Sequence, residues 1–147
     1  MRAAGSVIQP RLSIVLGLLL GLCVGSPAAE VVVVVSASCP VAALTREQVV
    51  DIFLGKASRF PDGSRVVPID RLEGSALRDE FYMKFAARSP AQVKAHWSKI
   101  IFTGRGQPPQ EIANAGEMKK ILAENPGAIG YIEQNMVDAS VRVVLAQ

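Results

Sequence analysis

A run of five consecutive valines, residues 31–35, constrains the fold of this chain more than any other feature. β-Branched side chains favour strands, where they pack well on a pleated surface. Successive side chains of a strand point to opposite faces, so a strand that is apolar at every position must be buried on both faces. Sheets covered by helices on both sides contain such strands. The run therefore predicts an α/β domain.

Helix-start signals divide the rest of the chain. Capping residues predict helices after Thr45, Ser89 and Asn114, and Gly55 is expected to end the first of these. Residues 103–109, rich in glycine and proline, are predicted to form a loop. Further strands are expected at residues 66–70, 128–132 and 141–145. With a helix after Ser75, the order is strand, helix, strand, three helices and two strands, which predicts a three-layer α/β/α domain.

The first 28 residues are predicted to be a secretory signal peptide. Arg2 and Arg11 precede an apolar stretch, residues 12–24, and small residues follow it up to Ala29. Cleavage after Ala28 fits this order and leaves an exported domain of residues 29–147. An uncleaved membrane anchor is the alternative, but the apolar stretch is shorter than the ~20 residues that span a bilayer.

Charge and reactive side chains exclude several classes of function. Without Arg2 and Arg11 the domain keeps 14 basic against 13 acidic residues, and it shows no basic run with interleaved aromatics, so no nucleic-acid partner is expected. Cys39 is its one cysteine, which predicts a buried thiol or an intermolecular bridge. His96 is the one histidine and is interpreted as a helix-surface residue, so no metal site and no cofactor are expected.

A candidate anion site lies where the strand at 66–70 is followed by a helix. Leu77, Phe81 and Phe85 recur every four residues and mark one face of that helix. Ser75 is placed to cap it, and the free N–H groups of a helix start attract anions. Arg71 leaves the strand on the same side and can add a charge-assisted contact.

A purely structural interpretation of this junction stands beside the anion site. Ser75 then serves only as the helix cap, which is a common role for serine. Arg71 in that case pairs with Glu73 or Asp79, which lie close to it in the sequence.

Three blocks of sequence, taken together and in this order, resemble the substrate-binding protein of the phosphate ABC transporter. They are residues 44–56, residues 71–81 and residues 125–133. The second block resembles that family's phosphate motif, in which an arginine is followed after two residues by Gly-Ser-Gly-Thr and then by a phenylalanine. The resemblance covers nearly all of the predicted domain.

The resemblance implies one lobe of a type II periplasmic-binding-protein fold, in which phosphate lies between two α/β lobes. Only the second lobe is matched, and the first has no counterpart in these 147 residues. The implied phosphate or oxyanion site consists of Arg71, Gly74, Ser75, Ala76 and Leu77. The last two replace the family's Gly-Thr, so a threonine hydroxyl is lost while the backbone N–H groups stay. Arg78 has no role in the motif and is either an added charge at the site or a solvated side chain.

The first functional expectation is therefore a periplasmic, phosphate-binding-protein-like domain that is not an enzyme. Its implied partners are inorganic phosphate or a similar oxyanion, an ABC permease, and a second lobe supplied by a dimer or another protein. The alternative is a non-binding envelope scaffold or protein-interaction module derived from one lobe. An enzyme has little support, because no nucleophile–base pair and no paired carboxylates stand out.

Overall fold

The computed structural model describes residue 5 and residues 29–146. The predicted cleavage site after Ala28, and nearly all of the predicted signal peptide, lie outside these described residues. In chain order the elements are β1 (Val31–Ser36), α1 (Arg46–Phe53), β2 (Val67–Arg71), α2 (Ala76–Ala86), α3 (Pro90–Phe102), β3 (Gln110–Ile112), α4 (Ala115–Glu124), β4 (Ala128–Glu133), the short 3-10 helix η1 (Gln134–Met136) and β5 (Val141–Leu145).

The five strands form one mixed sheet in the order β3-β2-β4-β1-β5. The strands β3, β2 and β4 run parallel, whereas β1 runs antiparallel to both β4 and β5. Val31 to Ser36 are all buried, and Val34 lies opposite Gly130 of β4. The valine run therefore lies at an interior position of the sheet, as its composition predicts.

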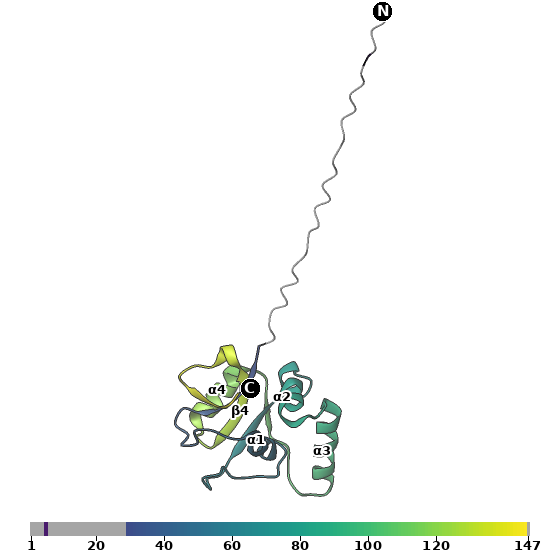
Figure 1. The fold of residues 1–147 in the computed structure, drawn as a ribbon. Helices are drawn as coiled ribbons and strands as arrows, with labels where there is room; N and C mark the ends of the chain where they lie inside the picture. The colour runs from purple at the N-terminus through teal and green to yellow at the C-terminus, as the bar shows by residue number, and fades with distance from the viewer. Residues whose placement is uncertain (1–4, 6–28, 147) are drawn as a thin grey trace, which may run out of the picture.

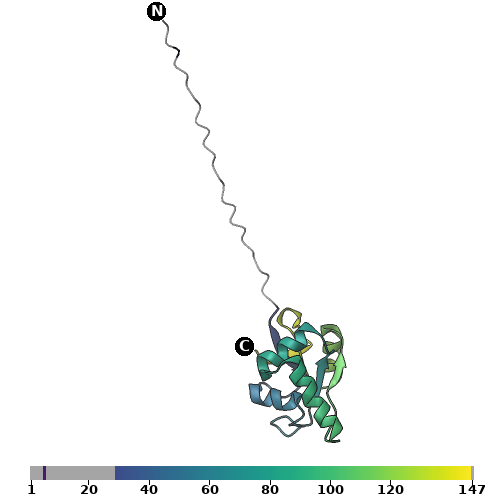
Figure 2. The ribbon, with the colours of Figure 1, turned by 90° about the vertical axis from the view of Figure 1, so that its right-hand side faces the viewer.

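Helices cover both faces of the sheet, so the predicted three-layer α/β/α architecture is confirmed (Figure 1). Alternate valines of β1 divide between two cores. Val31, Val33 and Val35 pack with residues of α1, α2 and α3. Val32 and Val34 pack on the other face with residues of α4. In Figure 2 the helices α2 and α3 lie in front of the strands.

The capping signals predict the helix starts correctly. Thr45 and Ser89 each form a full capping box, and Gly55 follows the C-cap of α1 with φ +74°. Asn114 caps α4 by accepting from the Glu117 N–H at 2.9 Å. This cap is not a full capping box, because the Glu117 carboxylate accepts from the Ala113 N–H rather than from the Asn114 N–H.

Two expectations from the sequence are wrong. The stretch after Pro109 contains the three-residue strand β3, which was not predicted because Gln110 and Glu111 are polar and exposed. His96 is half-buried, and its Nε2 lies 2.8 Å from the carbonyl oxygen of Leu54. A carbonyl only accepts, so this ring nitrogen carries the hydrogen and ties α3 to the end of α1.

Cys39 is buried with a free thiol, in agreement with the first of its two predicted states. Among the described residues, no helix is long and apolar enough to cross a bilayer.

Candidate functional site

Adjacent strands β2 and β3 end together, with Arg71 in register with Ile112. From β2 the chain continues into α2, which packs on the face shared with α1 and α3. From β3 it continues into α4 on the opposite face. The carboxyl ends of β2 and β3 are therefore a topological switch point, the place where open α/β sheets bind ligands.

The start of α2 follows a tight turn at Gly74 and Ser75. Gly74 adopts φ +87°, a conformation that side chains disfavour, and the turn is closed by a hydrogen bond from the Ser75 N–H to the Leu72 carbonyl at 3.0 Å. The Ser75 hydroxyl accepts from the Arg78 N–H at 3.4 Å, so the predicted cap is present. Among the described residues, the N–H groups of Ala76 and Leu77 donate no hydrogen bond. These two donors are available to a ligand.

Arg71 is the last residue of β2 and is only 7% exposed. Its Nη1 lies 3.6 Å from the Glu133 carboxylate at the end of β4, too far for a hydrogen bond. Within the described chain, Nε and Nη1 of Arg71 and Oε2 of Glu133 are buried without a hydrogen-bond partner. Buried polar atoms are normally satisfied, so this guanidinium has capacity for an acceptor.

Asp70, 1% exposed, is the centre of a buried polar network behind Arg71. Its carboxylate accepts from the Arg71 N–H at 2.8 Å, from the Tyr82 hydroxyl at 2.7 Å and from the Tyr131 hydroxyl. The Arg78 Nε donates to the same carboxylate at 3.2 Å. The network joins β2, α2 and β4, and it fixes the backbone from which Arg71 projects.

The buried network changes the ionisation of its members. Burial, followed by the Asp70 carboxylate, raises the pKa of both Tyr82 and Tyr131 far above the ordinary value of a tyrosine. Burial lowers the pKa of Arg78, but Asp70 and the two tyrosines outweigh it, so that pKa lies above its ordinary value. Both tyrosines therefore stay neutral and Arg78 stays charged under physiological conditions.

The structure brings Arg71 and the start of α2 to one edge of the sheet. It shows that the expected pairing of Arg71 with Glu73 or Asp79 is wrong, because Arg71 lies beside Glu133 and Glu73 pairs with Lys94 instead. Arg71 belongs to the extended strand β2, whereas Glu73 lies in the turn that follows the strand.

Arg78 is not a solvated side chain. It is 7% exposed, pairs with Asp70, and lies 3.7 Å from the Glu111 carboxylate. The Leu77 side chain packs in the core, so only its backbone faces the candidate site.

Sequence reasoning missed the acidic half of this site. Asp70 immediately precedes Arg71 in a buried strand, and an acid at such a position signals a buried partner. Glu111 and Glu133 come from other strands, and only the pairing of those strands with β2 brings them near.

The chain resembles solved phosphate-transport binding proteins in fold. It is 22% identical to an ABC-type phosphate transport receptor from Vibrio cholerae, with a TM-score of 0.62, over 78% of this chain and 45% of the receptor. A protein assigned as a phosphate ABC transporter substrate-binding protein from Clostridium perfringens, solved with bound phosphate, is 25% identical, with a TM-score of 0.61, over 78% of this chain and 44% of that one.

PstS from Borrelia burgdorferi is 16% identical with a TM-score of 0.54. This chain thus spans less than half the length of these neighbours and matches a single lobe of the binding-protein fold. No protein-family model matches the chain, and no curated protein sequence does.

Proposed function

We propose that this domain binds inorganic phosphate or a similar tetrahedral oxyanion where β2 ends and α2 begins. Arg71 supplies a guanidinium, Ser75 a hydroxyl, and Ala76 and Leu77 supply backbone N–H groups. Gly74 makes the turn that aims this backbone, and Arg78 acts behind the site through Asp70. No covalent chemistry is assigned to the domain, which acts as a binding protein and not as an enzyme.

The observation that carries this proposal is the buried guanidinium of Arg71 with two nitrogens that lack an acceptor. Leaving a buried donor unsatisfied costs about 1–3 kcal/mol, and more for a charged group. An anion would satisfy these nitrogens together with the free N–H groups of the first turn of α2. The fold of phosphate-transport binding proteins, one of them solved with phosphate, supports this choice of anion.

A second candidate function is a scaffold that binds no anion. The observation in its favour is the charge at the site. Arg71 and Arg78 face three carboxylates, those of Asp70, Glu111 and Glu133. These carboxylates already neutralise both guanidinium groups and oppose the entry of an anion.

Calorimetric titration with phosphate separates the two candidates. We expect binding by the wild type, and Arg71→Ala should weaken it tenfold to a hundredfold, because a charge-assisted hydrogen bond contributes about 1.5–3 kcal/mol. The matched control is Lys120→Ala, which removes one positive charge from the exposed surface of α4, across the sheet. Equal affinities in Arg71→Ala and Lys120→Ala, or no heat with the wild type, would favour the scaffold.

The proposed location is the periplasm, after cleavage of a signal peptide near Ala28. The basic and apolar order of residues 1–28 supports export, and the structural neighbours are transport receptors. Mass spectrometry of the protein from its native host should find a mature N-terminus near Ala29. A full-length chain held in the membrane fraction would contradict this.

The proposed partners are an ABC permease and a second lobe that closes over the anion. The neighbours extend over more than twice the matched length, which supports the need for a further surface. Co-purification with permease subunits would identify the first partner.

A further inference from the structure

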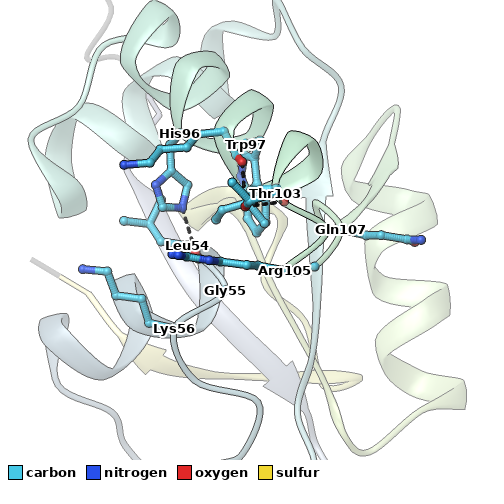
Figure 3. Close-up of a pocket in the computed structure, with 11 residues that line it drawn as sticks. Leu54, Gly55, Lys56, His96, Trp97, Thr103, Arg105 and Gln107 are labelled. Atoms are coloured by element: carbon cyan, nitrogen blue, oxygen red, sulfur yellow. Dashed lines mark hydrogen bonds between the residues drawn. The ribbon is translucent and has the colours of Figure 1, made fainter.

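A cavity lies between the end of α1, the C-terminal half of α3 and the 103–109 loop (Figure 3). Its volume is about 330 Å³, the lower end of the range of small-molecule sites. Trp97 forms one wall and packs on Gly55, where an added Cβ would lie 2.8 Å from the ring. His96 also lines the cavity, and its hydrogen bond to the Leu54 carbonyl holds the ring in place.

The charged residues that line this cavity are all basic. They are Lys56, Lys99 and Arg105, and no acidic side chain of residues 29–146 lines it. In Figure 3 the Arg105 side chain runs from the loop toward Leu54, whereas Gln107 points the other way. The domain as a whole is nearly neutral, so the acidic residues that balance this positive charge lie elsewhere on the domain.

Half of the unpaired cations among the described residues line this cavity. In residues 29–146, six lysine and arginine side chains have neither an ion pair nor a hydrogen bond: Lys56, Arg65, Arg88, Lys99, Arg105 and Lys120. All except Lys120 line this cavity or two hollows that share its lining residues. Lys99 also stabilises the C-terminal end of α3, but Lys56 and Arg105 lie beyond helix ends.

Apolar side chains form part of the cavity wall, and Trp97, which is 6% exposed, is one of them. Its ring and Ile100 provide apolar surface beside the cations. A ligand that fits both features has a negative group attached to a flat apolar body.

We propose that this cavity binds a small organic anion, with a phosphate or carboxylate on Arg105, Lys99 and Lys56 and an apolar group against Trp97. The site is separate from the switch point at Arg71. It does not depend on whether phosphate binds there.

Trp97 is the one tryptophan of the chain and lines this cavity, so its fluorescence should respond to a ligand bound there. The probes are phenyl phosphate and benzoate, with benzyl alcohol as the uncharged control of similar shape. We expect both anions to change the fluorescence saturably, whereas benzyl alcohol should not. Arg71→Ala should leave the Kd for phenyl phosphate within about twofold, which separates this site from the proposed phosphate site.

The matched variants are Arg105→Gln and Lys120→Gln, both at exposed positions where the fold tolerates a change. Arg105→Gln should weaken phenyl phosphate binding about fivefold, and Lys120→Gln by less than about twofold, because exposed charge pairs contribute modestly. The proposal is overturned by equal effects of the two variants, by equal binding of benzyl alcohol, or by no response up to about 10 mM probe. Binding to anionic lipid vesicles without binding of either probe would also overturn it.

Discussion

Glu133 is the residue that most directly opposes an anion on Arg71. Its carboxylate lies 3.6 Å from the Arg71 Nη1 and is partly buried. We expect Glu133→Gln to strengthen phosphate binding about threefold to fivefold, because a neutral amide removes a repulsion of up to about 1 kcal/mol. Calorimetry at neutral pH measures the change, with Glu124→Gln as the control, because Glu124 is an exposed acid on α4 that pairs with no described residue. A weaker affinity in Glu133→Gln alone would mean that the carboxylate helps to hold the anion.

Ser75 has two proposed roles, as the cap of α2 and as a ligand of phosphate. A comparison with a second capping serine, Ser89, distinguishes the two roles. Ser75→Ala should lower the free energy of unfolding by ~1 kcal/mol through loss of the cap, and it should also weaken phosphate binding. Ser89 caps α3 in the same way, through a hydrogen bond from the Gln92 N–H at 3.2 Å. Ser89→Ala should cost a similar free energy and leave the affinity unchanged. Equal affinities in both variants would restrict Ser75 to capping.

Single residues were predictable where their role is local. The cap at Ser75 and the positive φ at Gly74 follow from neighbours within four residues. The partner of Arg71 did not follow, because Glu133 lies 62 positions away and meets it only through the pairing of β2 with β4.

At the scale of elements, the carboxylate of Asp70 joins one helix and two strands through both tyrosines of the chain. Burial raises the pKa of Tyr82 and Tyr131 far above the ordinary value of about 10, so the folded domain binds these protons more tightly than the unfolded chain. The two neutral phenols make their full contribution to the free energy of unfolding below pH ~10. Above it the unfolded chain releases the protons, so the free energy of unfolding falls as pH rises.

We therefore expect tyrosinate absorbance near 295 nm to appear only as the domain unfolds. Above pH ~10 the two tyrosines together should lower the free energy of unfolding by up to about 2.7 kcal/mol per pH unit, and Tyr82→Phe should halve that slope. Denaturant unfolding followed by circular dichroism measures the slope. Ionisation of either tyrosine near pH 10 in the folded domain would contradict the buried network.

Elements were predictable where their pattern is strong. The valine run gave a strand covered on both faces, and capping residues marked α1, α3 and α4. The strand β3 has three residues, two of them polar, and forms because β2 offers it an edge. Pairing with another strand, which local sequence does not report, decides such a short element.

At the scale of the whole molecule, the three blocks of sequence that resemble the phosphate-binding family predicted one lobe. The comparison with solved structures agrees.

The affinity for phosphate should follow from the geometry of a single lobe. We expect a monomer of this chain to bind phosphate weakly. The Arg71 guanidinium, the Ser75 hydroxyl and two N–H groups contribute about 8–10 kcal/mol in gross terms, at ~2 kcal/mol for each charge-assisted bond. Lost translational and rotational freedom opposes this by at least ~4 kcal/mol.

The remaining 4–6 kcal/mol corresponds to a Kd of roughly 0.04–1 mM, and the repulsion by Glu133 makes binding weaker still. A covering surface would exclude water and strengthen each contact, because the same charges interact more strongly at lower dielectric. Calorimetry with phosphate over a range of protein concentrations, together with the molar mass in solution, tests this. Affinity that rises as the protein associates would support a shared site, since association then supplies the missing cover. Micromolar binding by a strict monomer would show that one lobe suffices, and that the free N–H groups and the buried guanidinium act far more strongly than open, solvated contacts do.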